Sequence, residues 1–243
     1  MVPHQPRYEI AQPTRAGHVP PRADGLAAVV ARQTQQGRVE GFVAAYRTAV
    51  QGFYPQLADN PDYTAIINPR QQQRLEAYLA DAEDKGATLL PLYPQAQGRR
   101  MPHCLLLNVG DDMQVMQEEI FGPLLPVVPY ERIEDAFAYI NRRPRPLALY
   151  YFGYDKREQQ RVLHETHSGG VCLNDTLLHV AQDDLPFGGI GPSGMGHYHG
   201  HEGFLTFSKA KGVFIKQRLN AARLIYPPYN KAILKLVYQL FVR

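Results

Sequence analysis

The sequence predicts an α/β fold, a largely parallel sheet with flanking helices. From Val39 onward, short apolar runs alternate with amphipathic segments of helical spacing. That order is typical of βαβ units around a parallel sheet. One run, Leu147–Phe152, is apolar without interruption, which favours a strand covered on both faces. With 44% hydrophobic residues over 243 positions, the chain is long and apolar enough to bury a substantial core.

The expected helices have recognisable ends. Apolar residues recur at helical spacing over Val39–Phe53 until Pro55 interrupts the pattern. Asn68 and Pro69 offer an N-cap followed by proline at the first helical position, and Gly86 ends this second helix. Further helices are expected at 133–140, from Asp155 onward and at 230–243, with a short helical segment after Asp111; strands are expected at 87–93, 104–109, 124–129 and 171–173.

The two ends of the chain differ in character from its middle. Residues 1–38 are rich in Pro, Arg, Gln and His and show little periodicity, so we expect a poorly ordered leader and a folded domain over 39–243. The segment 230–243 reads as a terminal amphipathic helix. Its short length and three cations favour packing or a dimer contact over a membrane-surface role.

Composition excludes several classes of protein. A net charge of +3 from 26 basic and 23 acidic residues offers no concentrated field for binding nucleic acid. The two cysteines lie far apart in apolar runs, which favours a reducing compartment, and we expect the cytoplasm. No apolar stretch approaches the roughly 18 residues that span a bilayer, and the first residues lack the apolar core of a signal peptide.

Three sequence blocks carry the functional signal. They are QEEIFGP at Gln117–Pro123, SGGVCLND at Ser168–Asp175 and LPFGGIGPSGMG at Leu185–Gly196. Taken singly, each is weak, because paired glutamates often mark a solvated helix end and glycine-rich loops are usually only turns. Their order and spacing together are far more specific.

In this order the three blocks resemble the aldehyde dehydrogenase family. The stretch GMGHYHG at 194–200 is similar to the class 3 branch, with coniferyl aldehyde dehydrogenases as the nearest relatives. The resemblance runs from about Val39 to near the C-terminus and matches only the later half of a family member. It implies an aldehyde dehydrogenase catalytic-domain fold and oxidation of an aldehyde, here an aromatic one, to the carboxylic acid with NAD or NADP.

The resemblance also implies roles for individual residues. Glu119 matches the glutamate that accepts hydrogen bonds from the nicotinamide ribose, a task that suits a carboxylate because its two oxygens can take two adjacent hydroxyls. Phe121 matches the phenylalanine that packs against that ribose, and Gly122 and Pro123 fix the turn. Phe187 matches a position on the aldehyde tunnel, where an aromatic wall favours apolar or aromatic aldehydes.

The family mechanism requires a cysteine thiolate, an oxyanion site with an Asn amide and a glutamate that activates water. No cysteine precedes Cys104, so we expect no catalytic residue in this chain. Cys104 and Cys172 lie in apolar runs that raise a thiol's pKa, which favours packing roles for both.

Two interpretations of the chain stay open. One is an inactive C-terminal part of an aldehyde dehydrogenase, produced by a frameshift or a misassigned start. The other is a non-catalytic remnant that associates with a full-length dehydrogenase or forms a homodimer, through an edge strand or the last helix.

Three histidines alternate at His197, His199 and His201. On an extended segment they would project to one face and could share a metal ion. The first two belong to the family's pattern without a metal role, so we expect ordinary hydrogen bonding in a loop and no metal site.

Overall fold

The computed structural model describes residues 29–32, 38–57, 60–216, 218, 226–229 and 231–241. The chain divides into two compact units, Met1–Phe207 and Ser208–Arg243. The described strands are β1 (Val29–Arg32), β2 (Thr88–Pro91), β3 (Cys104–Leu107), β4 (Leu124–Tyr130), β5 (Ala148–Tyr151) and β6 (Gly170–Leu173). The described α-helices are α1 (Arg38–Phe53), α2 (Pro69–Asp84), α3 (Gln114–Gln117), α4 (Ile133–Asn141), α5 (Lys156–Glu165), α6 (Gly200–Thr206) and α7 (Ala232–Phe241).

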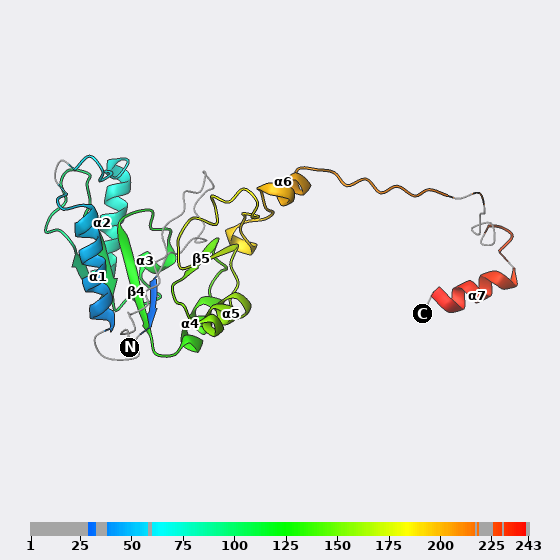
Figure 1. Cartoon of the computed structure of the whole chain (residues 1–243), viewed down its shortest axis with the longest axis horizontal. Coiled ribbons are helices and arrows are strands. Elements are labelled where there is room, and N and C mark those ends of the chain that lie inside the picture. Colours follow the sequence, from blue (N-terminus) through cyan, green and yellow to red (C-terminus); the bar gives the residue numbers. More distant parts are fainter. Residues whose placement is uncertain are drawn as a thin grey trace. The chain divides into compact units, whose positions relative to one another are not determined.

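The first unit contains two sheets rather than one. A four-stranded sheet has the order β1-β4-β3-β2, and β5 pairs with β6 in a separate two-stranded sheet (Figure 1). Among the described strands, three of the four pairings are parallel and only β2 with β3 is antiparallel. The predicted α/β class with a largely parallel sheet is therefore confirmed.

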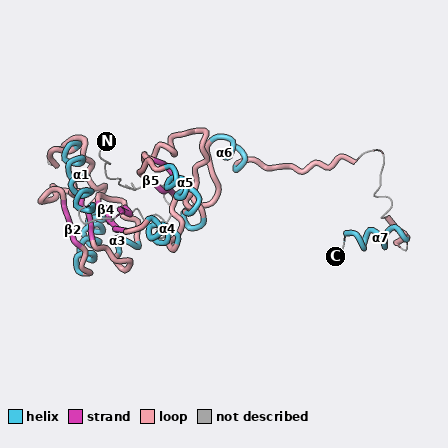
Figure 2. The backbone as a smooth tube through the Cα atoms, turned by 60° about the horizontal axis from the view of Figure 1, so that its bottom comes forward, coloured by secondary structure: helices cyan, strands magenta, loops and turns pink. Residues whose placement is uncertain are grey.

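Strand β3 shows why the larger sheet is covered on both faces. Cys104 and Leu106 pack with helices α2 and α3, whereas Leu105 packs with Phe42 of α1. Successive side chains of a strand point to opposite faces, so an uninterrupted apolar run requires a cover on each side. In Figure 2 the strands accordingly lie between α1 and α3. Each fully buried leucine stabilises the fold by about 2 kcal/mol.

Helix α2 begins as its sequence predicts. The Asn68 side chain accepts a hydrogen bond from the Gln71 amide at 2.9 Å, and Pro69 is the first helical residue. Gly86, with φ +92°, follows the helix, a conformation that glycine adopts without strain. These residues fix where α2 begins and ends.

Helices α4 and α5 cover the smaller sheet. Phe137 of α4 and Val162 of α5 share a core cluster with Tyr151 of β5. The start of α5 has the predicted cap, because Asp155 Oδ1 accepts hydrogen bonds from two backbone amides of the first turn. The Glu158 carboxylate accepts a hydrogen bond from the Tyr151 hydroxyl at 2.7 Å, which joins the helix to the strand.

The leader expected over 1–38 is interrupted by a strand. Residues 1–28 and 33–37 lie outside the described residues, but Val29–Arg32 pairs in parallel with Val127–Tyr130 of β4. The β-branched pair Val29 and Val30 suits a strand, and its pairing satisfies backbone groups along β4. At these four residues the structure corrects the expected boundary at residue 38.

The second unit contains the predicted terminal helix, observed as Ala232–Phe241. Its apolar and polar residues segregate at helical spacing, as expected for an amphipathic helix. None of the helices in the described ranges is long and apolar enough to cross a membrane.

His103, the residue directly before β3, lies among tyrosines. Its Nδ1 is 3.0 Å from the Tyr46 hydroxyl, and its ring lies near those of Tyr54 and Tyr63. Burial lowers the pKa of His103 and raises that of Tyr46 to about 12. Both groups are therefore neutral in the folded protein near pH 7.

This burial predicts a pH dependence of stability. The unfolded chain takes up a proton at His103 near its ordinary pKa of about 6.5, whereas the folded chain takes it up only at lower pH. The contribution of His103 is therefore fully present above the unfolded pKa and is lost as pH falls below it. We expect His103→Phe to reduce the loss of unfolding free energy between pH 7 and 5 in urea titrations. The exposed His164, changed to Gln, is the control, and an equal reduction there would contradict the prediction.

Candidate functional site

The turn between α3 and β4 carries the two residues expected at the cofactor. Ile120 is only 4% exposed and packs in the core beside α2 and α3, whereas Phe121 is 51% exposed. Glu119, on the other side of Ile120, is also exposed. The buried isoleucine thus holds the turn to the fold, while the side chains before and after it face outward.

Phe121 adopts an unusual backbone conformation. Its φ is +45°, in the left-handed region that L-residues other than Asn and Asp rarely enter. Such a conformation persists only where surrounding contacts determine it, and it is most often found at functional sites. The turn is therefore held in its shape by its neighbours.

Close packing fixes the C-terminal half of the turn. A Cβ added to Gly122 would lie 2.5 Å from Cδ1 of Leu75, a side chain that is fully buried on α2. The next carbonyl, of Pro123, accepts a hydrogen bond from the Cys104 amide at 2.9 Å, where β4 joins β3. A larger residue at 122 would therefore have to displace the buried Leu75 side chain.

Glu119 has the properties needed to contact a ribose. Its carboxylate is exposed and makes no hydrogen bond or ion pair with any other described residue. Two free carboxylate oxygens can accept from two adjacent hydroxyls, and the exposed ring of Phe121 offers an apolar surface two residues away. These residues fit the nicotinamide ribose of NAD or NADP.

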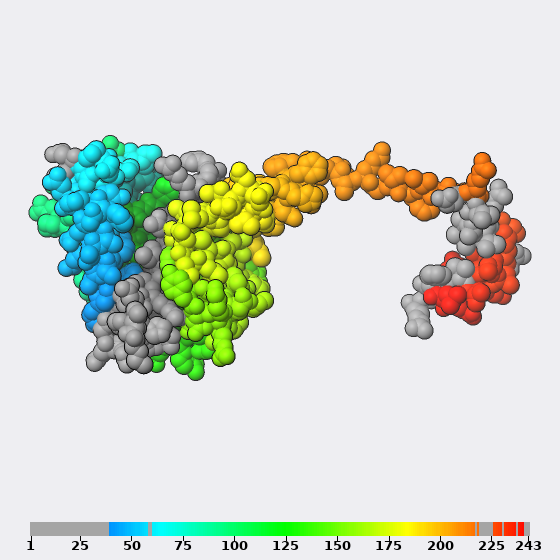
Figure 3. Space-filling model, viewed as in Figure 1, coloured from blue at the N-terminus to red at the C-terminus, as the bar shows by residue number. Residues whose placement is uncertain are grey.

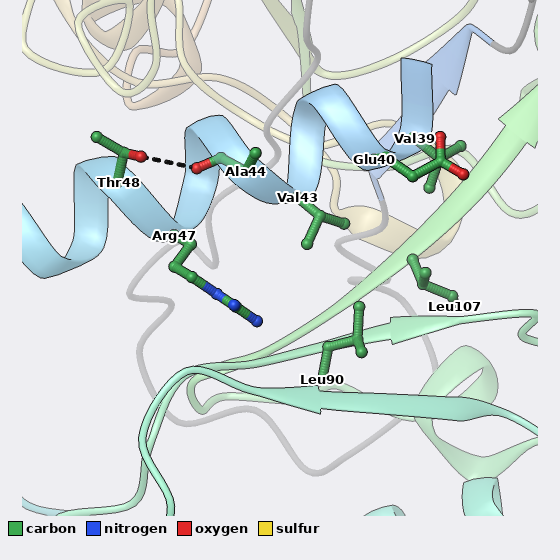
Figure 4. A pocket seen from close by; sticks show the side chains of 8 residues that line it. All are labelled: Val39, Glu40, Val43, Ala44, Arg47, Thr48, Leu90 and Leu107. Carbon is green, nitrogen blue, oxygen red and sulfur yellow. Dashed lines mark hydrogen bonds between the residues drawn. The ribbon is translucent and has the colours of Figure 1, made fainter. Parts of the chain in front are cut away.

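One cavity among the described residues lies away from this turn. It has a volume of about 400 Å³ and is bounded by α1, β2 and β3 (Figure 4). Val43 and Arg47 of α1 point toward Leu90 of β2 across this space, and α1 itself lies on the molecular surface (Figure 3). Neither Glu119 nor Phe121 lines it.

Phe187 lies in a loop built from backbone contacts. It exchanges two backbone hydrogen bonds of 2.9 Å with Tyr198, which closes the segment between them into a hairpin-like loop. A Cβ at Gly188 would overlap the carbonyl oxygen of Gly196, and one at Gly189 would overlap that of Ser193. Gly188 and Gly189 are therefore required where one backbone segment lies directly against another.

The Phe187 ring is half-buried in an aromatic cluster. Its ring contacts are with His179, Tyr198 and His199 at centroid distances of 5.9, 5.5 and 6.3 Å. Burial lowers the pKa of His179, and neither of its ring nitrogens has a hydrogen-bond partner among the described residues. The structure thus surrounds Phe187 with aromatic rings, which suits the predicted aromatic wall. It does not bring Phe187 into ring contact with Phe121.

Asn174 joins the two strands of the smaller sheet. Its side-chain amide accepts from the Gly153 amide at 2.8 Å and donates to the Gly153 carbonyl at 3.2 Å. Its own backbone is left-handed, with φ +60°. Asn174, the residue before the last of the SGGVCLND block, therefore ties the end of β6 to the loop after β5, a role that the sequence did not reveal.

Cys104 does not have the setting of an activated nucleophile. Cys104 is buried in β3, and burial raises the pKa of its thiol to about 11. Cys172 lies half-buried within β6, and both thiols are free. A reactive thiolate requires a lowered pKa and access, so the packing role predicted for Cys104 agrees with its surroundings.

The three alternating histidines do not lie on one extended segment. Helix α6 begins at Gly200, so His201 lies on a helix and stacks on Phe204 at 6.4 Å. In the described ranges, no group of three His, Cys, Asp or Glu residues is arranged to hold a metal ion. The loop hydrogen bond expected for His199 is absent at Nδ1, which is buried without a partner among the described residues.

Comparisons with known proteins agree on one family. A family model described as the aldehyde dehydrogenase family matches residues 27–213. A relative from Pseudomonas aeruginosa, named "Probable coniferyl aldehyde dehydrogenase", is 78% identical over 206 residues, which cover 85% of this chain and 43% of that relative. The chain therefore spans less than half the length of this curated relative.

Solved structures show the same likeness. The substrate-bound state of Staphylococcus aureus AldH matches with a TM-score of 0.70 and 37% identity, over 85% of this chain and 45% of that one. The P. syringae indole-3-acetaldehyde dehydrogenase AldA, solved with NAD+, matches with a TM-score of 0.57 and 25% identity, over 63% of this chain and 31% of that one. The chain belongs to the aldehyde dehydrogenase family.

Proposed function

We propose that this chain supplies the nicotinamide-ribose contacts and part of the aldehyde site for NAD(P)-dependent oxidation of an aldehyde to its carboxylic acid. The observation that carries the proposal is the turn at Glu119–Phe121. An unpartnered carboxylate and an exposed ring lie on either side of the buried Ile120. The nicotinamide, when bound, accepts the hydride; the two side chains bind and orient its ribose.

The substrate that we propose is an aromatic aldehyde of the coniferyl type. The 78% identical relative is named for coniferyl aldehyde. Phe187, within its cluster of aromatic rings, offers the kind of surface on which a planar aromatic substrate packs well. Phe187 is accordingly proposed as a substrate-binding residue.

We assign no nucleophile within this chain. A covalent route needs a thiolate, and the burial of Cys104 opposes its ionisation. This observation also favours a second candidate function, a non-catalytic protein that associates with a full-length aldehyde dehydrogenase or with a second copy of itself. The two unpaired cysteines fit a reducing compartment, and we propose the cytoplasm.

The test of the proposed site uses nicotinamide mononucleotide, which carries the ribose but lacks the adenosine half. We expect the purified chain to show saturation-transfer NMR signals at the nicotinamide and ribose protons, with affinity on the order of millimolar because few contacts are made. Glu119→Gln and Phe121→Ala should each weaken this signal severalfold. Adjacent Glu118 is also exposed, so Glu118→Gln is the matched control.

Three results would contradict the proposed cofactor role. The wild-type chain would show no transfer to nicotinamide mononucleotide, or Glu118→Gln would weaken it as much as Glu119→Gln. Adenosine monophosphate, which carries a ribose and phosphate without nicotinamide, reports nonspecific binding. An equal response to both compounds would likewise count against the assignment.

A further inference from the structure

One arginine of α2 reaches the turn that carries Glu119 and Phe121. The Arg74 guanidinium donates from Nη1 to the Glu119 carbonyl at 2.9 Å and from Nη2 to the Ile120 carbonyl at 2.7 Å. Both acceptors belong to the backbone, so these bonds leave the Glu119 carboxylate free. Two successive peptide groups are thus held by one planar side chain.

The guanidinium is itself fixed in place. Its Nε donates to the Gln71 side chain at 2.7 Å, and its plane lies over the Tyr78 ring with Cζ 5.0 Å from the ring centroid. Gln71 in turn belongs to the first turn of α2, which Asn68 caps. Arg74 therefore projects from a rigid helix with its donors already oriented.

The turn needs such support because the backbone of Phe121 is in the left-handed region, with φ +45°. The carbonyls of Glu119 and Ile120 mark the orientations of the peptide groups on either side of Ile120. Rotating either peptide group would break its hydrogen bond to Arg74 and change the direction in which the Glu119 or Phe121 side chain points. Leu75, the next residue of α2, contacts Gly122, so the helix holds both halves of the turn.

We propose that Arg74 is a positioning residue for the cofactor contacts, which holds the turn so that Glu119 and Phe121 both face outward. The inference rests on the proposed function of those two residues, but its structural part can be tested separately. The fork geometry of arginine is essential, because a lysine ammonium is a single point charge that lacks the planar fork.

The first experiment is amide hydrogen exchange measured by NMR on the full chain. We expect Arg74→Gln to speed exchange by on the order of tenfold at the Cys104 amide, which is protected by its hydrogen bond to the Pro123 carbonyl at the end of the turn, and Arg74→Lys to speed it less. Amides of α2 beyond its first turn should change little. Arg70 lies on the same helix and is exposed, so Arg70→Gln is the matched control and should leave the turn unchanged.

The second experiment repeats the nicotinamide mononucleotide titration with the same variants. Arg74→Gln should weaken the saturation-transfer signal as Glu119→Gln does, although it removes no group assigned to the ligand, and Arg74→Lys should recover part of it. Unchanged exchange at the Cys104 amide would overturn the inference. So would equal acceleration throughout α2 with a lowered Tm, since that pattern indicates a purely structural role. Absence of any wild-type signal would contradict the proposed function, while the exchange data would still decide whether Arg74 holds the turn.

Discussion

Replacing Gly188 with alanine is expected to destabilise the first unit by about 3 kcal/mol, the upper part of the range for overpacking. The added methyl would overlap the Gly196 carbonyl oxygen, and Gly188 in turn lies against Gly169. Backbone atoms cannot rotate away as a flexible side chain can, so the loop that carries Phe187 must open. Urea unfolding followed by circular dichroism measures the loss.

A second glycine provides the control for this prediction. Gly52 lies in α1, and a Cβ added there meets nothing within 4 Å. Gly52→Ala should stabilise the protein by up to about 1 kcal/mol, because alanine favours the helix. If Gly188→Ala unfolds at the same urea concentration as the wild type, the close backbone packing described for this loop is wrong.

The purified chain is expected to form no NADH when NAD+ is supplied with coniferyl aldehyde or an aliphatic aldehyde. Cys104 is buried with its thiol pKa raised to about 11. Cys172 lies within β6, where it forms part of the sheet. Loss of a nucleophile removes the covalent route altogether, and the remaining members of a catalytic unit do not compensate for it. Absorbance at the NADH band reports turnover directly.

Cys172→Ser separates the outcomes of this assay. Turnover that survives dialysis and disappears in Cys172→Ser would contradict the prediction and make Cys172 the nucleophile. Turnover that the substitution leaves unchanged would indicate a contaminating enzyme. Cys104→Ala is the parallel variant, and we expect it to change stability only.

The sequence predicted most of the elements because their signals are local. Helix α2 is bounded by an Asn-Pro start and a glycine end, and the structure confirms both. The strand β4 and the helix α4 follow from apolar periodicity within a single segment. The family follows from three ordered motifs, and the comparisons confirm it.

Other features were missed because four-residue elements carry too little pattern. Strand β1 lies in a run of small apolar residues, and only its pairing with β4 distinguishes it from a loop. The division into two sheets is likewise a matter of which strands form hydrogen bonds with each other. Helix α6 begins directly after His199, in a stretch where the sequence predicted a loop.

The candidate site likewise has a part that the sequence identified and a part that only the tertiary structure revealed. The sequence by itself identified Glu119 and Phe121 as the proposed cofactor contacts, because their motif resembles the family motif that contacts the nicotinamide ribose. Only the tertiary structure decided how they are held: Arg74 lies 45 residues before Glu119, and its donors meet that carbonyl only when α2 packs beside the turn. Contacts between distant segments depend on packing, and no local pattern of residues encodes them.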